Sequence, residues 1–299
     1  MKSLSRKFRR VRPLLGTYVS IELQGESGEK LLNAYITEGF AAIAEVDRLM
    51  SYHRRDSDLS RLNRAKPGAW VSVSSPLTLK VLRTSNELFR ISRGVFDIRC
   101  GGVLAGWGEL PSFSWNRRFP ATVSSGVLPL EIQGMRVRKL GPWILDLGGI
   151  AKGYAVDRAV EQFLRPDLKS RLCGVVNAGG DLRVWGSEAV PVGVKILGES
   201  FCGIRSFTMS RTAAATSSVR ARRISLRGHV TSAHVEMPSG KFLKEAKTVT
   251  VFASQCLLAD ALTKIVLLGS TDISGRCLSF YRANALVFGS DGRLEKIMG

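Results

Sequence analysis

The sequence predicts an α+β fold, in which helices pack against mixed and largely antiparallel sheets. Residues 29–50 and 77–92 carry apolar side chains at helical spacing, and so do residues 151–164 and 257–269. Short apolar stretches of strand length lie between these segments. Residues 175–186 run as a strand, a glycine turn and another strand, which is typical of a hairpin. Helices and short strands therefore share one chain.

Length and composition indicate an ordinary globular protein. The chain has 299 residues, enough for one large domain or two closely packed ones. Its hydrophobic content of 44% and charged content of 23% are unexceptional. We expect a basic N-terminal extension over residues 1–12 and a single domain over residues 13–299, which could consist of two closely packed subdomains.

The net charge of +19 predicts attraction to acidic partners, such as a phosphorylated ligand, an anionic membrane surface or nucleic acid. Nucleic-acid binding is disfavoured, because the basic residues are dispersed apart from the run at residues 2–12 and no binding motif accompanies them. No window approaches the roughly 18 apolar residues of a membrane span. Five widely spaced cysteines predict reduced thiols and a cytoplasmic location.

Further strands follow from apolar stretches along the chain. We expect an opening strand over residues 13–21. Later strands are expected over residues 192–196, 207–210, 248–253, 282–288 and 294–298.

Residues 143–157 are the most informative stretch for function. A short apolar strand is predicted over residues 143–147, followed by a turn at Gly148 and Gly149. A helix is expected from about Ala151, with Lys152 in its first turn. The free N–H groups at such a helix start favour an anion, and the lysine suggests a phosphate or carboxylate that compensates it. An ordinary strand-turn-helix unit with a solvated lysine is the alternative.

Several motifs, in order, carry a more specific resemblance. The stretch D-L-G-G-I-A-K-G-Y-A-V-D at residues 146–157 resembles the ApbE-type flavin transferase family, which passes FMN from FAD to protein hydroxyls. G-V-F-D at residues 94–97, A-G-G-D at residues 178–181 and the segment around His234 are similar to further motifs of that family. The resemblance extends from Pro13 to the end of the chain and implies the flavin transferase fold.

The resemblance implies a set of residues that bind FAD. They are Leu15, Tyr52, Val95, Phe96, Asp97, Asp146, Lys152 and Glu236. Leu15 stands where the family has a methionine. Tyr52 could instead be a half-buried structural tyrosine. Asp97 could instead stabilise its turn through its own side chain.

The resemblance also implies His234 as the base that takes the proton of the acceptor hydroxyl, with Lys152 beside the phosphates. Magnesium is implied at Asp260, the Gly149 carbonyl and Thr263. The family has a threonine four residues after that aspartate, where this chain has Lys264. An ammonium group at this spacing could neutralise Asp260 in place of a cation, unless a local shift makes Thr263 the ligand.

Two other departures concern the neighbouring motifs. Met237 replaces an aspartate near the histidine, and Glu236 could substitute for it; Ser218 replaces a glycine. The implied function is magnesium-dependent transfer of FMN from FAD to a threonine or serine of an acceptor protein, with release of AMP. The alternative is a relative that binds FAD or another nucleotide without transferring it.

Overall fold

The computed structural model describes residues 6–113, 126–166, 168, 172–186, 188–197, 202–219, 222–226, 229–231, 234–243 and 245–299. Its centre is one eight-stranded sheet with the order β1-β2-β6-β7-β10-β15-β16-β17, and every neighbouring pair is antiparallel. The strands are β1 Arg6–Leu14, β2 Thr17–Gly25, β6 Leu172–Ala178, β7 Asp181–Trp185, β10 Ala213–Ser218, β15 Thr248–Ala253, β16 Asn284–Phe288 and β17 Leu294–Met298. The predicted α+β class with antiparallel sheets is confirmed.

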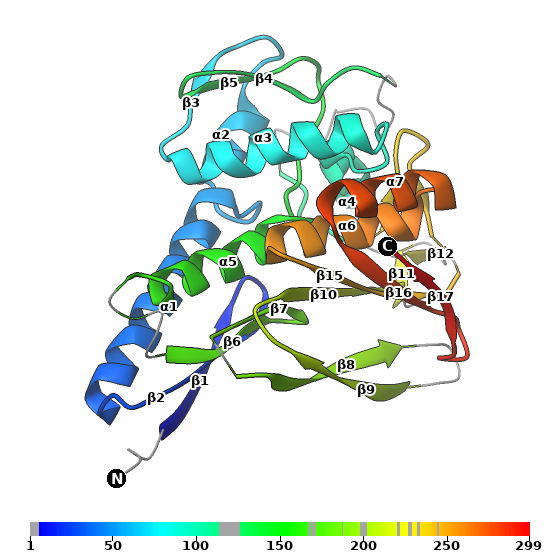
Figure 1. Ribbon diagram of the computed structural model, residues 1–299. Helices are drawn as coiled ribbons and strands as arrows, with labels where there is room; N and C mark the ends of the chain where they lie inside the picture. Colours follow the sequence, from blue (N-terminus) through cyan, green and yellow to red (C-terminus); the bar gives the residue numbers. More distant parts are fainter. Residues whose placement is uncertain are drawn as a thin grey trace.

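Helices cover one face of this sheet, and a hairpin lies against the other (Figure 1). The helices are α1 Glu29–Met50, α5 Ala151–Phe163, α6 Cys256–Leu268 and α7 Thr271–Tyr281. The hairpin consists of β8 Val190–Leu197 and β9 Cys202–Met209, and a small second core including Val184, Val192 and Met209 lies between it and the sheet. The main core lies between the sheet and the helices. Burial alternates along β2 and β6, whereas β10 and β15 have buried side chains on both faces because the hairpin covers the second face.

A further group of elements lies at the C-terminal end of α1 (Figure 1). It contains α2 Asp58–Arg64, α3 Pro76–Ile91, the short helices η1 Ile98–Cys100 and α4 Gly101–Gly106, and the small sheet of β3 Val71–Ser72, β5 Arg136–Lys139 and β4 Leu130–Gln133. Ser57 caps α2 by accepting from Ser60 N at 3.0 Å, and Ser75 caps α3. Two short two-stranded pairs complete the fold, β11 Arg222–Leu226 with β12 His229–Thr231 and β13 Val235–Glu236 with β14 Lys241–Phe242.

The N-terminal region differs from the prediction. Residues 6–12, expected as an extension, form most of β1, and the expected single strand is a hairpin with a two-residue turn at Leu15 and Gly16. Both turn residues have positive φ, 56° and 69°, which is uncommon for leucine. Phe8 packs on the main core, and the Arg12 guanidinium lies 4.8 Å from the centre of the Phe40 ring. Arg10 and Arg12 thus lie against α1, where Arg10 donates to the Thr37 hydroxyl. Lys7 and Arg9 are exposed on the edge strand, where charge discourages further pairing.

The expected strand at residues 143–147 is also absent. This segment is irregular, and it leads through the glycine turn into α5, which begins at Ala151 as predicted. Among the described residues, no helix combines the length and the apolar character needed to cross a bilayer.

Candidate functional site

A cavity of about 1000 Å³ opens where the ends of several elements meet. Its walls come from the β1–β2 turn, the end of α1, the loops before η1 and α5, strand β10, the segment at His234 and helix α6. Nine of the predicted site residues line it: Leu15, Tyr52, Val95, Phe96, Asp97, Asp146, Gly149, Lys152 and His234. Segments more than 200 residues apart in sequence therefore converge on one site of ligand size.

Three predicted residues do not face this cavity. Asp260 and Thr263 are fully buried, and Glu236 is exposed at the surface. The suggestion that Glu236 replaces the missing carboxylate near the histidine is therefore wrong. Glu236 lies on β13, where side chains alternate, so that Val235 faces the cavity and Glu236 points outward to accept from the Ser239 hydroxyl at 3.1 Å.

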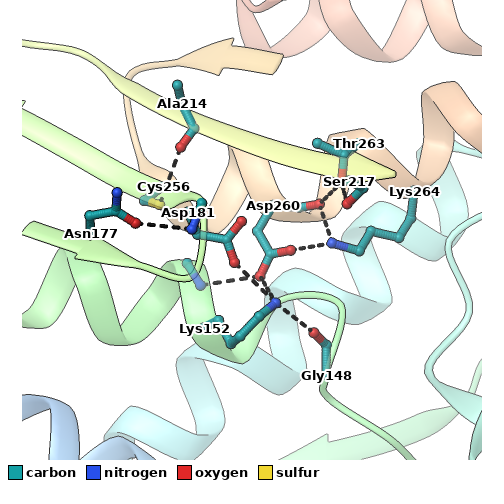
Figure 2. A network of polar contacts seen from close by, with 12 residues as sticks. Gly148, Lys152, Asn177, Asp181, Ala214, Ser217, Cys256, Asp260, Thr263 and Lys264 are labelled. Carbon is teal, nitrogen blue, oxygen red and sulfur yellow. Dashed lines mark hydrogen bonds and ion pairs between the residues drawn. The ribbon is translucent and has the colours of Figure 1, made fainter. Parts of the chain in front are cut away.

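Four charged side chains form a network at one end of the cavity (Figure 2). Lys152 Nζ lies 3.0 Å from Asp181 Oδ2 and 3.9 Å from Asp260 Oδ2. Lys264 Nζ pairs with Asp260 Oδ1 and donates to the Asp260 carbonyl at 3.1 Å. Gly153 N donates to Asp260 Oδ2 at 3.1 Å. Two partly exposed ammonium groups thus balance two buried carboxylates.

The pKa values follow from this arrangement. Burial would raise the pKa of Asp260, but Lys152 and Lys264 outweigh it and hold that pKa below its usual range. Burial and the nearby Asp260 charge raise the pKa of Asp181. Burial also opposes protonation of Lys152, yet the two carboxylates raise its pKa. Lys152 is therefore firmly cationic at neutral pH.

This network changes the interpretation of Lys152. We expected a ligand phosphate to compensate its charge, but Asp181 and Asp260 already do so. Most helix-start donors that we expected to be free also have protein acceptors. Gly148 N donates to the Asp146 carboxylate at 3.0 Å and Ala151 N to the Leu147 carbonyl at 2.9 Å. The glycine turn is therefore largely satisfied by the protein itself.

The implied magnesium site can be tested on the donor atoms themselves. Asp260 already accepts from Lys264 and Gly153, and the Thr263 hydroxyl donates to the Asp260 carbonyl and lies 2.7 Å from the Ser217 hydroxyl. Helix α6 is continuous from Cys256 to Leu268, so no local shift turns Thr263 toward the carboxylate. Within the described ranges, no group of three or more metal-binding side chains occurs. The residues present do not fit a magnesium ion.

Asp97 has the structural role that was the alternative. Its carboxylate accepts from Arg99 N at 2.9 Å and pairs with the Arg99 guanidinium, whose NH2 lies 2.7 Å from Oδ2. Both side chains are almost fully buried, with 1% and 2% of their surface exposed. Asp97 thus caps η1 and holds a buried arginine, which lies over the rings of Phe89 and Trp143.

Tyr52 and Asp146 also line the cavity. The Tyr52 ring is buried, 5.9 Å from the Phe113 ring centre and 6.2 Å from that of His53. Asp146 is held by the Gly148 amide, and burial raises its pKa. The cavity lining thus includes aromatic and apolar side chains as well as the two charged lysines. This combination suits a molecule that carries both a flat ring and phosphates.

His234 is half-buried and lines the cavity. Burial and the positive charges of Lys264 and Lys152 lower its pKa to about 4. The imidazole is therefore neutral at physiological pH, which is the form that accepts a proton.

Sequence reasoning missed three groups that shape the site. Asp181 was predicted only as part of a glycine hairpin, although its position directly after two glycines could have indicated a site residue. Asn63 and Lys139 are buried, and they hold residues 143–147 through hydrogen bonds to the main chain. No local pattern identifies the contact of Asn63 with Leu145 or that of Lys139 with Asn63, because these partners lie 82 and 76 positions apart.

Comparison with known proteins agrees with the fold and the resemblance. The sequence matches the ApbE family over residues 15–281, and the chain belongs to that family. The chain is 28% identical over 184 residues to a FAD:protein FMN transferase of Vibrio cholerae, and 25% identical over 164 residues to that of Haemophilus influenzae. These matches cover 58% and 50% of this chain but only 53% and 45% of the relatives, about half their length.

Solved structures share the whole fold. An ApbE protein of Thermotoga maritima superposes with a TM-score of 0.82 at 24% identity, covering 97% of both chains. The flavin transferase ApbE of Vibrio cholerae gives 0.77 at 22% identity, covering 98% of this chain and 96% of the other. At this identity the likeness concerns the fold.

Proposed function

We propose that this chain binds FAD in the cavity and transfers its FMN part to a hydroxyl of an acceptor protein. The observation that carries the proposal is the cavity of about 1000 Å³, whose lining residues include Tyr52, Lys152, Lys264 and His234. Relatives in the family are named FAD:protein FMN transferases. A flat ring and a diphosphate would meet groups of matching chemistry.

The reaction is a phosphoryl transfer within the diphosphate of FAD. The oxygen of an acceptor threonine or serine attacks the phosphorus of the FMN part, and a new P–O bond forms. The bond from that phosphorus to the bridging oxygen breaks, and AMP leaves with the electron pair. Neutral His234 takes the hydroxyl proton, and the ammonium groups of Lys152 and Lys264 offset charge on the phosphate oxygens.

A specific observation favours a second candidate, a flavin-binding protein without transfer. Asp260 is neutralised by Lys264, and the position of a carboxylate near His234 is taken by Met237, which is 8% exposed. Such a protein would bind FAD and leave its diphosphate intact.

The cytoplasmic location expected from the cysteines stays a prediction.

The test is to incubate the purified chain with FAD and an acceptor domain that carries a threonine or serine flavinylation site. Mass spectrometry of the acceptor and chromatography of released AMP are the two readouts. We expect FMN on the acceptor and AMP in equal amount. FAD binding with neither product would support the second candidate, and absence of FAD binding would remove both.

A further inference from the structure

Lys264 is a positive charge fixed against a buried carboxylate. Asp260 has no exposed side-chain surface, and Lys264 lies one helical turn later on α6, with Nζ on both the carboxylate and the carbonyl of Asp260. This is the ion pair that the i,i+4 spacing predicts. The buried acid is therefore already neutralised from within its own helix.

The lysines, and not the acids, face the cavity. Lys152 and Lys264 line it and retain 31% and 17% of their side-chain exposure, whereas Asp181 and Asp260 retain 4% and 0%. Figure 2 shows both ammonium groups directed at Asp260 from different sides. A ligand that enters the cavity therefore meets positive charge, with the negative charge beneath it.

The Lys264 side chain also occupies the space between the expected metal ligands. A Cβ placed on Gly149 would lie 3.5 Å from Lys264 Cε and 3.7 Å from its Cγ, so the lysine stem runs directly past this glycine. Its ammonium group ends on Asp260. A divalent cation requires several oxygen ligands at about 2.1 Å, and here it would have to displace one ammonium group and lie beside another.

We propose that the Lys264 ammonium takes the place of a divalent cation, so that this site excludes the metal and binds the diphosphate of its ligand without one. The identity of that ligand as FAD rests on the proposed function, whereas the exclusion of the metal does not. The two lysines that line the cavity would donate directly to the diphosphate, while Asp181 and Asp260 beneath them balance their charge.

Exclusion of the metal is tested with Mn²⁺ alone, read by electron paramagnetic resonance of the free ion during titration. We expect the unaltered chain to leave the Mn²⁺ signal unchanged at millimolar concentrations. Lys264→Thr, which frees the Asp260 carboxylate and adds a hydroxyl, should take up about one ion per chain. Lys80→Thr is the matched control, because Lys80 is an exposed helical lysine outside the cavity.

Uptake of Mn²⁺ by the unaltered chain would overturn the proposal. A Lys264→Thr chain that keeps its helical circular dichroism and still takes up no Mn²⁺ would also count against it, since Lys264 would then not be the excluding group. The Mn²⁺ titration of the unaltered chain needs no variant. It can therefore refute the proposal even if Lys264→Thr fails to fold.

A second experiment measures FAD affinity by titration calorimetry in magnesium and in EDTA. We expect the two dissociation constants of the unaltered chain to agree within about twofold, and Lys264→Thr to bind at least about tenfold more weakly in EDTA, with recovery in magnesium. A tenfold gain from magnesium in the unaltered chain would contradict the inference. Failure to bind FAD in either buffer would remove the proposed function, while the Mn²⁺ titration would still decide on the metal.

Discussion

Asn63 on α2 binds both main-chain polar groups of Leu145, although 82 residues separate them. Its Nδ2 donates to the Leu145 carbonyl at 2.9 Å, and Leu145 N donates to its Oδ1 at 2.8 Å. Both bonds are buried, and Asn63 has no exposed surface. A side-chain amide thus satisfies the main chain of a segment that pairs with none of the described strands, one residue before Asp146.

The first prediction concerns this contact. Asn63→Ala should lower the free energy of unfolding by about 2–4 kcal/mol, because two buried main-chain groups lose their partners. Asn33→Ala on α1 is the control, and it should change stability by less than about 0.5 kcal/mol. Urea unfolding followed by circular dichroism measures both. Equal stability of the two variants would show that water replaces the amide.

The second prediction concerns Asp157 on α5, which caps a different helix. Its carboxylate accepts from Cys256 N at 2.9 Å and Leu257 N at 2.8 Å at the start of α6, and pairs with Arg183 at 2.7 Å. Asp157→Ala should lower the free energy of unfolding by about 3–5 kcal/mol, because a half-buried arginine and two helix-start N–H donors lose their partner together.

A double-mutant cycle with Arg183→Met separates these contributions. The coupling energy between the two substitutions reports the ion pair, and we expect more than about 1 kcal/mol. The rest of the stability lost in Asp157→Ala reports the capping of α6 by the Asp157 carboxylate. A coupling near zero would assign the whole effect to the amide contacts of α6.

Most helices and central strands could be predicted, because apolar periodicity within a segment records which face is buried. Helices α1, α3, α5 and α6 begin and end close to the expected residues. The errors fall where distant partners decide the structure. Residues 143–147 look like a strand but bond to Asn63 and η1 instead, since Asp146 N donates to the Ile98 carbonyl at 2.7 Å.

In the candidate site too, contacts within one helix could be predicted from the sequence, whereas contacts between distant segments could not. The i,i+4 pair of Asp260 and Lys264 could be predicted from helix geometry alone. The compensation of Lys152 by Asp181 could not, because it depends on how β7 lies beside α5. The turn at Leu15 could not be predicted either, because leucine rarely adopts a positive φ such as the 56° found here.

The third prediction concerns Lys152. Lys152→Met removes one of two ammonium groups at the cavity and leaves the buried Asp181 without its cation. If the proposed function holds, FAD should bind at least about tenfold more weakly, while riboflavin, which has no phosphate, should bind with nearly unchanged affinity. Fluorescence titration of the two flavins makes the comparison. Equal losses for both would indicate a general disturbance of the cavity instead of lost phosphate contact.

The fourth prediction uses the lowered pKa of His234, about 4. As a base His234 must be neutral, so the transfer rate should rise as pH increases through about 4 and stay level to neutrality. His234→Gln should lower the rate by about 10²-fold or more with FAD affinity retained. Single-turnover release of AMP at a series of pH values is the measurement. An apparent pKa near 6.5 would mean that the ring lies in water, away from the two lysines.

The fifth prediction concerns Lys139, a fully buried lysine that donates to the main-chain carbonyls of Asn63 at 2.9 Å and Trp143 at 3.1 Å. Burial lowers the pKa of Lys139 from 10.5 to about 8. Between these values the unfolded chain holds more protons than the folded chain, so the free energy of unfolding should rise with pH from about 8 to 10.5.

The rise attributable to Lys139 should reach about 3 kcal/mol, at about 1.4 kcal/mol for each pH unit between the two pKa values. Tyrosines also titrate in this range, so the informative quantity is the difference between the unaltered chain and Lys139→Met, which should grow by this amount. Lys80→Met, which removes an exposed lysine, should give a profile parallel to that of the unaltered chain. A parallel profile for Lys139→Met as well would show that the buried ammonium keeps its ordinary pKa, and that the carbonyls of Asn63 and Trp143 solvate the charge as well as water does.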